Sequence, residues 1–100
     1  MNYLESVAYA IKAEVPADKL PKANTDLLFL IYAALMFAKG EAVTREDVHN
    51  AWTAWATHIG KDSKALVAFD QLSPDLQSQD QPFVEAIVSV ATRSQREHFV

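Results

Sequence analysis

The side chains of this chain that could perform acid–base chemistry or bind a metal are three histidines, His49, His58 and His98. His49 and His58 are nine residues apart, which is about 180° around a helix, so they cannot share one metal ion. The chain has no cysteine and lacks the H-E-x-x-H spacing of metalloproteases. We therefore expect no metal site, and we interpret both histidines as residues at the rim of a core.

Trp52 and Trp55 lie one helical turn apart on the same predicted helix. Tryptophans at this spacing are most often core residues, and a buried indole N–H then needs a hydrogen-bond partner such as Asp70, Ser73 or Asp80. The alternative is a ligand pocket between the two tryptophans and residues 65–70, with His49 and Asp70 as its polar anchors. The sequence leaves both interpretations open.

The remaining candidates for catalysis are three aspartates that recur every five residues, Asp70, Asp75 and Asp80. Turn and helix-cap chemistry explains Asp75 and Asp80. No base stands beside Ser63 or Ser73 in the sequence, so nucleophilic catalysis has no support. We expect that the protein is not an enzyme and that it has no cofactor.

Length and composition indicate one helical domain over residues 1–100, because half of the 100 residues are hydrophobic and only two are glycine. The net charge is −4 and the nine basic residues are scattered, which argues against nucleic-acid binding. The first residues, MNYLESVAYAIKAEVP, lack the basic and apolar regions of a signal peptide. We therefore expect a cytoplasmic location.

The pattern of apolar residues, caps and prolines predicts an all-α fold, a compact domain of four to five helices. The first helix runs over residues 2–14 and ends before Pro16, and the second begins at 24–26 and ends at Gly40. The third follows a capping box at Thr44 and ends at Gly60. A short extended segment over 65–69 comes next, then a turn at Ser73-Pro74 and a last helix capped by Asp80. Residues 94–100 are expected to be frayed.

Residues 27–38, LLFLIYAALMFA, are apolar on every side of the second helix. The 12 residues are too few to span a membrane, which takes about 20, so we expect a central helix surrounded by the others and no membrane partner. A face of this helix that its neighbours leave uncovered could form a homodimer. The residues proposed for such an interface are Phe29, Tyr32, Met36 and Phe37, with Tyr9 on the exposed side of the first helix.

Three short series in the second half carry a resemblance to known proteins: Val48-His49-x-Ala51-Trp52, Leu66-Val67-x-Phe69-Asp70-x-Leu72 and Gln79-Asp80-x-Pro82. Together they resemble a family of small uncharacterised proteins of actinobacteria and their phages. They are also distantly similar, from Thr44 to Arg93, to the repeat domain of ryanodine receptors, the RyR domain. Ala68 stands where that family usually has proline, and its glycine-tryptophan-tyrosine-glycine hairpin is absent, so the hairpin's ligand-facing surface cannot be carried over.

The resemblance implies a compact helical domain of phage or actinobacterial origin that acts by binding. Our first hypothesis is a small, phage-encoded cytoplasmic protein that binds a host or phage protein without catalysis. The second is a module that binds a nucleotide or metabolite near Trp52, Trp55 and residues 65–70.

Overall fold

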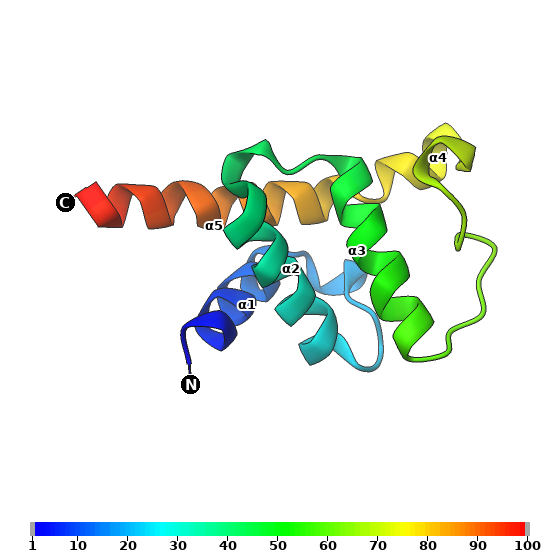
Figure 1. The fold of residues 1–100 in the computed structure, drawn as a ribbon, viewed down its shortest axis with the longest axis horizontal. Coiled ribbons are helices and arrows are strands. Elements are labelled where there is room, and N and C mark those ends of the chain that lie inside the picture. Colours follow the sequence, from blue (N-terminus) through cyan, green and yellow to red (C-terminus); the bar gives the residue numbers. More distant parts are fainter. Residues whose placement is uncertain (1, 100) are drawn as a thin grey trace.

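Five α-helices and three short 3₁₀ turns make up the part of the chain that the computed structural model describes, residues 2–99 with side chains to Ser94 (Figure 1). The α-helices are α1 (Tyr3–Glu14), α2 (Thr25–Lys39), α3 (Arg45–His58), α4 (Pro74–Ser78) and α5 (Gln81–Phe99). The 3₁₀ turns are η1 (Ala17–Lys19), η2 (Gly40–Ala42) and η3 (Phe69–Gln71). No strand occurs within residues 2–99, and the predicted all-α class is confirmed.

Local side-chain chemistry explains where most of the helices begin. Asn2 and Thr44 each form a capping box, in which the side chain accepts a hydrogen bond from the backbone N–H of Glu5 or Asp47 and that residue's carboxylate accepts one in return. Ser73 caps α4 with its side chain alone, which accepts from the N–H of Leu76, and proline occupies the first turn. These starts are as the sequence predicts.

The start of α2 differs, because no side chain caps it. Asn24 takes a left-handed conformation with φ 58° and ψ 26°, which asparagine tolerates better than most residues. Its backbone carbonyl accepts two hydrogen bonds, one from the N–H of Leu28 at 3.4 Å and one from the indole Nε1–H of Trp55 on α3 at 3.0 Å. A tertiary contact thus supports the start of this helix.

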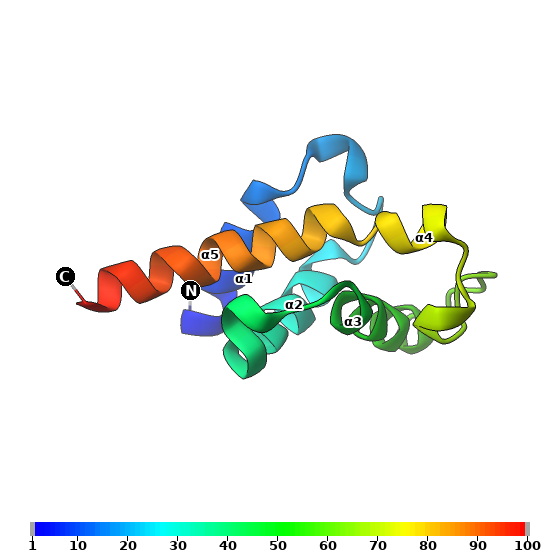
Figure 2. The same ribbon diagram turned by 90° about the horizontal axis from the view of Figure 1, so that it is seen from above.

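Helix α2 is the centre of the fold, and α1, α3 and α5 pack against it (Figure 2). One side of α2 is buried by these three helices, and its buried residues are Leu28, Phe29, Tyr32, Ala33 and Met36. The rings of Phe29 and Tyr32 meet edge to face, with centroids 5.4 Å apart, and Tyr32 lies 5.6 Å from Phe83 of α5. This aromatic cluster joins α2 to α5.

The segment after α3 differs from the sequence prediction. Residues 65–69, expected to be extended, form an irregular loop that leads into η3. Ser63 explains this, because its hydroxyl accepts from the N–H of Ala65 and its carbonyl from the N–H of Leu66, which bends the chain locally. Helix α5 runs to Phe99, and neither glycine nor proline follows Pro82. The fraying of residues 94–100 stays a prediction. Val100 lies outside the described residues.

None of the helices within residues 2–99 combines the length and the apolar character needed to cross a membrane.

Neighbouring leucines on α2 provide a test of which side of this helix is buried. Leu28 has no exposed surface, whereas Leu27 is partly exposed. Leu28→Ala should lower the free energy of unfolding by about 3 kcal/mol, because it leaves a cavity in the core. Leu27→Ala should cost about 1 kcal/mol or less. Urea denaturation of both variants measures the difference, and equal losses would contradict this orientation of α2.

Candidate functional site

A cavity of about 300 Å³ lies where α2, α3, the start of α5 and the loop after α3 meet. Its aromatic and polar lining comes from segments far apart in the sequence. The lining residues that bear such side chains are Lys19, Tyr32, His49, Trp52, Trp55, Lys61, Gln79, Asp80 and Phe83. Concave sites with mostly apolar walls and a few convergent polar groups are typical of small-ligand binding. The cavity is therefore our first candidate site.

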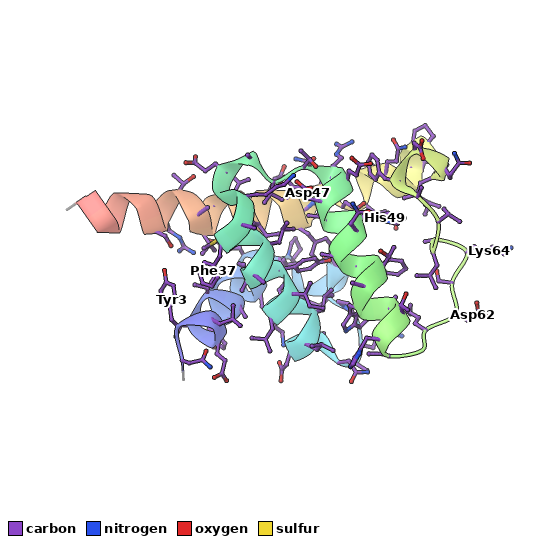
Figure 3. All side chains as sticks on the ribbon, viewed as in Figure 1. Tyr3, Phe37, Asp47, His49, Asp62 and Lys64 are labelled. Carbon is purple, nitrogen blue, oxygen red and sulfur yellow. The ribbon has the colours of Figure 1, made fainter. Side chains whose placement is uncertain are left out.

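His49 is one of the polar groups in this wall and is only 3% exposed. Its Nε2 lies 2.6 Å from the backbone carbonyl of Val67, so Nε2–H donates to that oxygen. The ring also lies 6.0 Å from that of Trp52 and 6.1 Å from that of Phe69, measured between centroids. His49 thus attaches α3 to the loop over residues 65–69 (Figure 3). The sequence analysis placed His49 at the rim of the core, and the structure buries it more deeply than that.

The two tryptophans take different roles in the wall. Trp55 is 2% exposed and donates its indole N–H to the carbonyl of Asn24, so it belongs to the core and also lines the cavity. Trp52 is only partly buried. The expected indole partners, Asp70, Ser73 and Asp80, are not used by Trp55. The structure therefore reconciles the two interpretations, because the cavity is cut into the edge of the core.

Asp80 is the carboxylate of this site, and sequence reasoning assigned it only a capping role. The sequence analysis also named it as a possible partner for a tryptophan indole. Asp80 immediately precedes α5, and its backbone carbonyl accepts from the N–H groups of Phe83 and Val84. Its Oδ2 is buried and has no hydrogen-bond partner within the described part of the chain. Asp70, the predicted anchor, is exposed in η3 and does not line the cavity. Spacing alone could not distinguish these two aspartates.

Burial raises the pKa of Asp80 to about 6, and the nearby positive charges of His49 and Arg45 oppose the shift. Burial also raises the pKa of Tyr32, and the charge of Asp80 adds to this effect. Tyr32 and Asp80 are thus close enough to interact, although they are 48 positions apart in the sequence. At neutral pH, Asp80 is mainly an ionised acceptor in a partly apolar wall.

The second candidate site is a surface that we call the α1–α2 face. Its α2 residues lie on the side of the helix opposite the core, and its α1 residues are two exposed tyrosines. Three aromatic residues of this face are well exposed: Tyr3 by 68%, Tyr9 by 69% and Phe37 by 46%. The rings of Tyr3 and Phe37 stack with centroids 5.3 Å apart (Figure 3). The residues of the α1–α2 face are Tyr3, Tyr9, Leu27, Leu30, Ile31, Ala34, Phe37 and Ala38.

The expected dimer residues do not all lie on this face. Phe29, Tyr32 and Met36 are 1%, 1% and 6% exposed, so they are core residues and are not available to a second copy. Phe37 and Tyr9 are exposed, as expected. The physical reason is that every side of α2 between Leu27 and Ala38 is apolar, so no polar residue marks the outer side.

A groove of about 270 Å³ between α1 and α2 adjoins the α1–α2 face. Tyr9 and Leu30 belong to its apolar lining, and Glu5, Lys12 and Asp26 are its charged residues. The ammonium of Lys12 is already engaged, since it donates to the Thr25 hydroxyl at 3.0 Å and lies 3.8 Å from the Asp26 carboxylate. The groove therefore presents an apolar floor with net negative charge.

A comparison with protein families matches residues 2–92 to the Domain of unknown function (DUF7701). The chain belongs to the DUF7701 family. No curated protein and no solved structure matches it. Membership in DUF7701 names no activity, and the comparison says nothing about similarity to RyR domains or about origin in phages or actinobacteria.

The cavity of this DUF7701 domain combines ionisable side chains with aromatic walls. Its lining offers one carboxylate, one imidazole already bonded to the backbone, two lysines at the rim and flat aromatic walls. Within the described residues, no cluster of three or more histidine, cysteine, aspartate or glutamate side chains could hold a metal ion.

The raised pKa of Asp80 leads to a prediction about stability and pH. Because the pKa is higher in the folded protein than the ordinary value of about 3.9, the ionised carboxylate opposes folding above about pH 6, and its protonation favours folding at lower pH. Asp80→Asn should therefore raise the free energy of unfolding at about pH 7.5, by about 1 kcal/mol after allowance for partial exposure. The gain should shrink toward about pH 4.5.

Urea denaturation at both pH values measures this effect. Asp75→Asn is the matched control, because it removes an exposed carboxylate from α4 with the same change of charge. Tyr32, His49 and Arg45 face Asp80 and are unchanged in both variants. A gain that is independent of pH, or equal in the control, would contradict the assignment of a buried, ionised Asp80.

Proposed function

We propose that the protein is a non-catalytic interaction protein whose α1–α2 face binds an amphipathic helix of a partner protein. The observation that carries the proposal is that the outer side of α2 presents no polar side chain from Leu27 to Ala38, although part of this side is exposed. Exposed apolar areas of this kind are typical of protein interaction sites. Three exposed aromatic residues, Tyr3, Tyr9 and Phe37, are of the type that dominates binding energy at interfaces.

The spacing of the outer residues of α2 favours a helix as the occupant. Leu27, Leu30, Ala34 and Phe37 follow each other at intervals of three and four residues, which is the spacing of a helix–helix seam. Ala34 and Ala38 are exposed and small, so a second helix axis could approach closely between the larger side chains of Ile31 and Phe37. A partner helix with its own apolar stripe would complete the coverage of α2.

Charge favours a basic partner over a second copy of this chain. The net charge is −4, and Glu5 and Asp26 border the groove beside the α1–α2 face, with the Asp26 side chain fully exposed. A second copy would bring the same acidic residues to the interface, whereas lysines or arginines flanking a partner's apolar stripe would pair with them. The homodimer is thus the less favoured occupant.

The partner in this proposal is a host or phage protein, and the setting is the cytoplasm of an actinobacterium infected by a phage. The resemblance over residues 44–93 supports this choice of partner and setting.

A photo-crosslinking residue placed at Ala34 tests the proposed face. Expressed in the native host, this protein should crosslink to one protein through a helical peptide with an apolar stripe and basic flanks. The variant Ala34→Arg should weaken capture of the same protein at least tenfold, because a long charged side chain keeps the partner helix from packing against α2. Ala54→Arg is the matched control and should bind normally, because Ala54 is an exposed alanine of α3 outside the α1–α2 face.

The results of this experiment distinguish a partner protein from a second copy of the chain on the α1–α2 face. Crosslinks from position 34 to another copy of the chain, together with twice the chain mass in light scattering, would replace the partner helix by a homodimer. Equal capture by both arginine variants would overturn the α1–α2 face as the binding surface. Circular dichroism checks that both variants keep their helices.

The cavity beside Asp80 favours a second candidate function, the binding of a small ligand such as a nucleotide or metabolite. The supporting observation is the buried Oδ2 of Asp80, which has no partner within the described residues. A buried polar group without a hydrogen bond is costly, and a bound ligand is one way to satisfy it.

A further inference from the structure

We propose that the cavity beside Asp80 binds a guanine nucleotide, with the N–H edge of the base donating to Asp80 and the phosphate next to Lys19 and Lys61. The proposal rests on the second candidate function and names its ligand class. Three features of the lining carry it: an unsatisfied carboxylate, a set of aromatic walls and two lysines at the rim.

Asp80 sets the chemistry of the ligand's inner end. An ionised carboxylate only accepts hydrogen bonds, so the group that meets it must donate. Its side chain turns easily about the bond to the carboxylate, which is a broad two-fold torsion, and either oxygen can therefore face the cavity. Guanine presents two adjacent donors, N1–H and N2–H, on one edge, so whichever oxygen faces the cavity meets a donor. Adenine and cytosine instead place a ring-nitrogen lone pair beside their one donor, and this lone pair would repel the carboxylate.

The walls favour a flat ring system. Tyr32, Trp52, Trp55 and Phe83 all line the cavity, and aromatic side chains bind bases by stacking. A volume of about 300 Å³ is at the small end of the range for ligand pockets. It suits a single base rather than a dinucleotide.

The lysines at the rim of the cavity determine which charge the outer end of the ligand carries. Lys19 and Lys61 line the cavity and are exposed, and neither forms a salt bridge within the part of the chain that is described. Two free ammonium groups attract a phosphate and repel a cation. A ligand with a donating ring inside and a phosphate outside satisfies both ends of the cavity.

The indole N–H signals of the protein provide a direct readout, because Trp52 and Trp55 are its two tryptophans and both line the cavity. Titration with GMP, followed by NMR at neutral pH, should shift both signals in a saturable way, with an affinity roughly tenfold higher than that for AMP. Asp80→Asn should remove this preference, since an amide offers one donor and one acceptor. Asp75→Asn should keep it.

A second pair of variants tests the phosphate end. The double variant Lys19→Gln/Lys61→Gln should lower the affinity for GMP to that for guanosine and leave guanosine binding unchanged, whereas Lys64→Gln should bind GMP normally. Dispersed NMR spectra show that each variant is folded. If AMP and GMP bind equally in wild type and in Asp80→Asn, the guanine assignment is overturned and small-ligand binding remains. If no nucleotide shifts the indole signals at millimolar concentration, both are overturned.

Discussion

The constraint on which the structure depends is that α2 is apolar around its whole circumference. Such a helix is stable in water only when other segments remove most of its surface from solvent. Helices α1, α3 and α5 do this on one side, where Leu28, Phe29 and Tyr32 are almost completely buried. The domain is too small to cover the other side as well, and the outer residues of α2 are left partly exposed. The α1–α2 face is a direct consequence.

The same packing generates the cavity. To cover Tyr32, the start of α5 must approach α2, and Phe83 then lies 5.6 Å from the tyrosine ring. Asp80, three residues earlier, is brought into the wall with it. Burial there raises the pKa of the carboxylate to about 6. Within the described residues, its Oδ2 caps no helix and the carboxylate forms no salt bridge. Such an energetic cost is often found at binding sites.

Two hydrogen bonds hold the other walls of the cavity in place. The indole of Trp55 donates to the carbonyl of Asn24 at 3.0 Å, and the imidazole of His49 donates to the carbonyl of Val67 at 2.6 Å. Both acceptors are backbone carbonyls outside the regular helices, and that of Asn24 also accepts from the N–H of Leu28 at 3.4 Å. Helix α3 therefore orders the start of α2 and the loop after α3 by means of the residues that line the cavity.

The sequence by itself determined the helices and most of their ends, because caps, prolines and glycines act on the few residues beside them. The capping boxes at Asn2 and Thr44 and the cap at Ser73 are of this local kind. It also identified His49, Trp52 and Trp55 as neighbours of one candidate site. Only the tertiary structure decided which side of α2 is buried, and that Asp80 rather than Asp70 lines the cavity. A uniformly apolar helix carries no mark of its outer side, and two aspartates in similar turns differ only in the distant residues that pack against them.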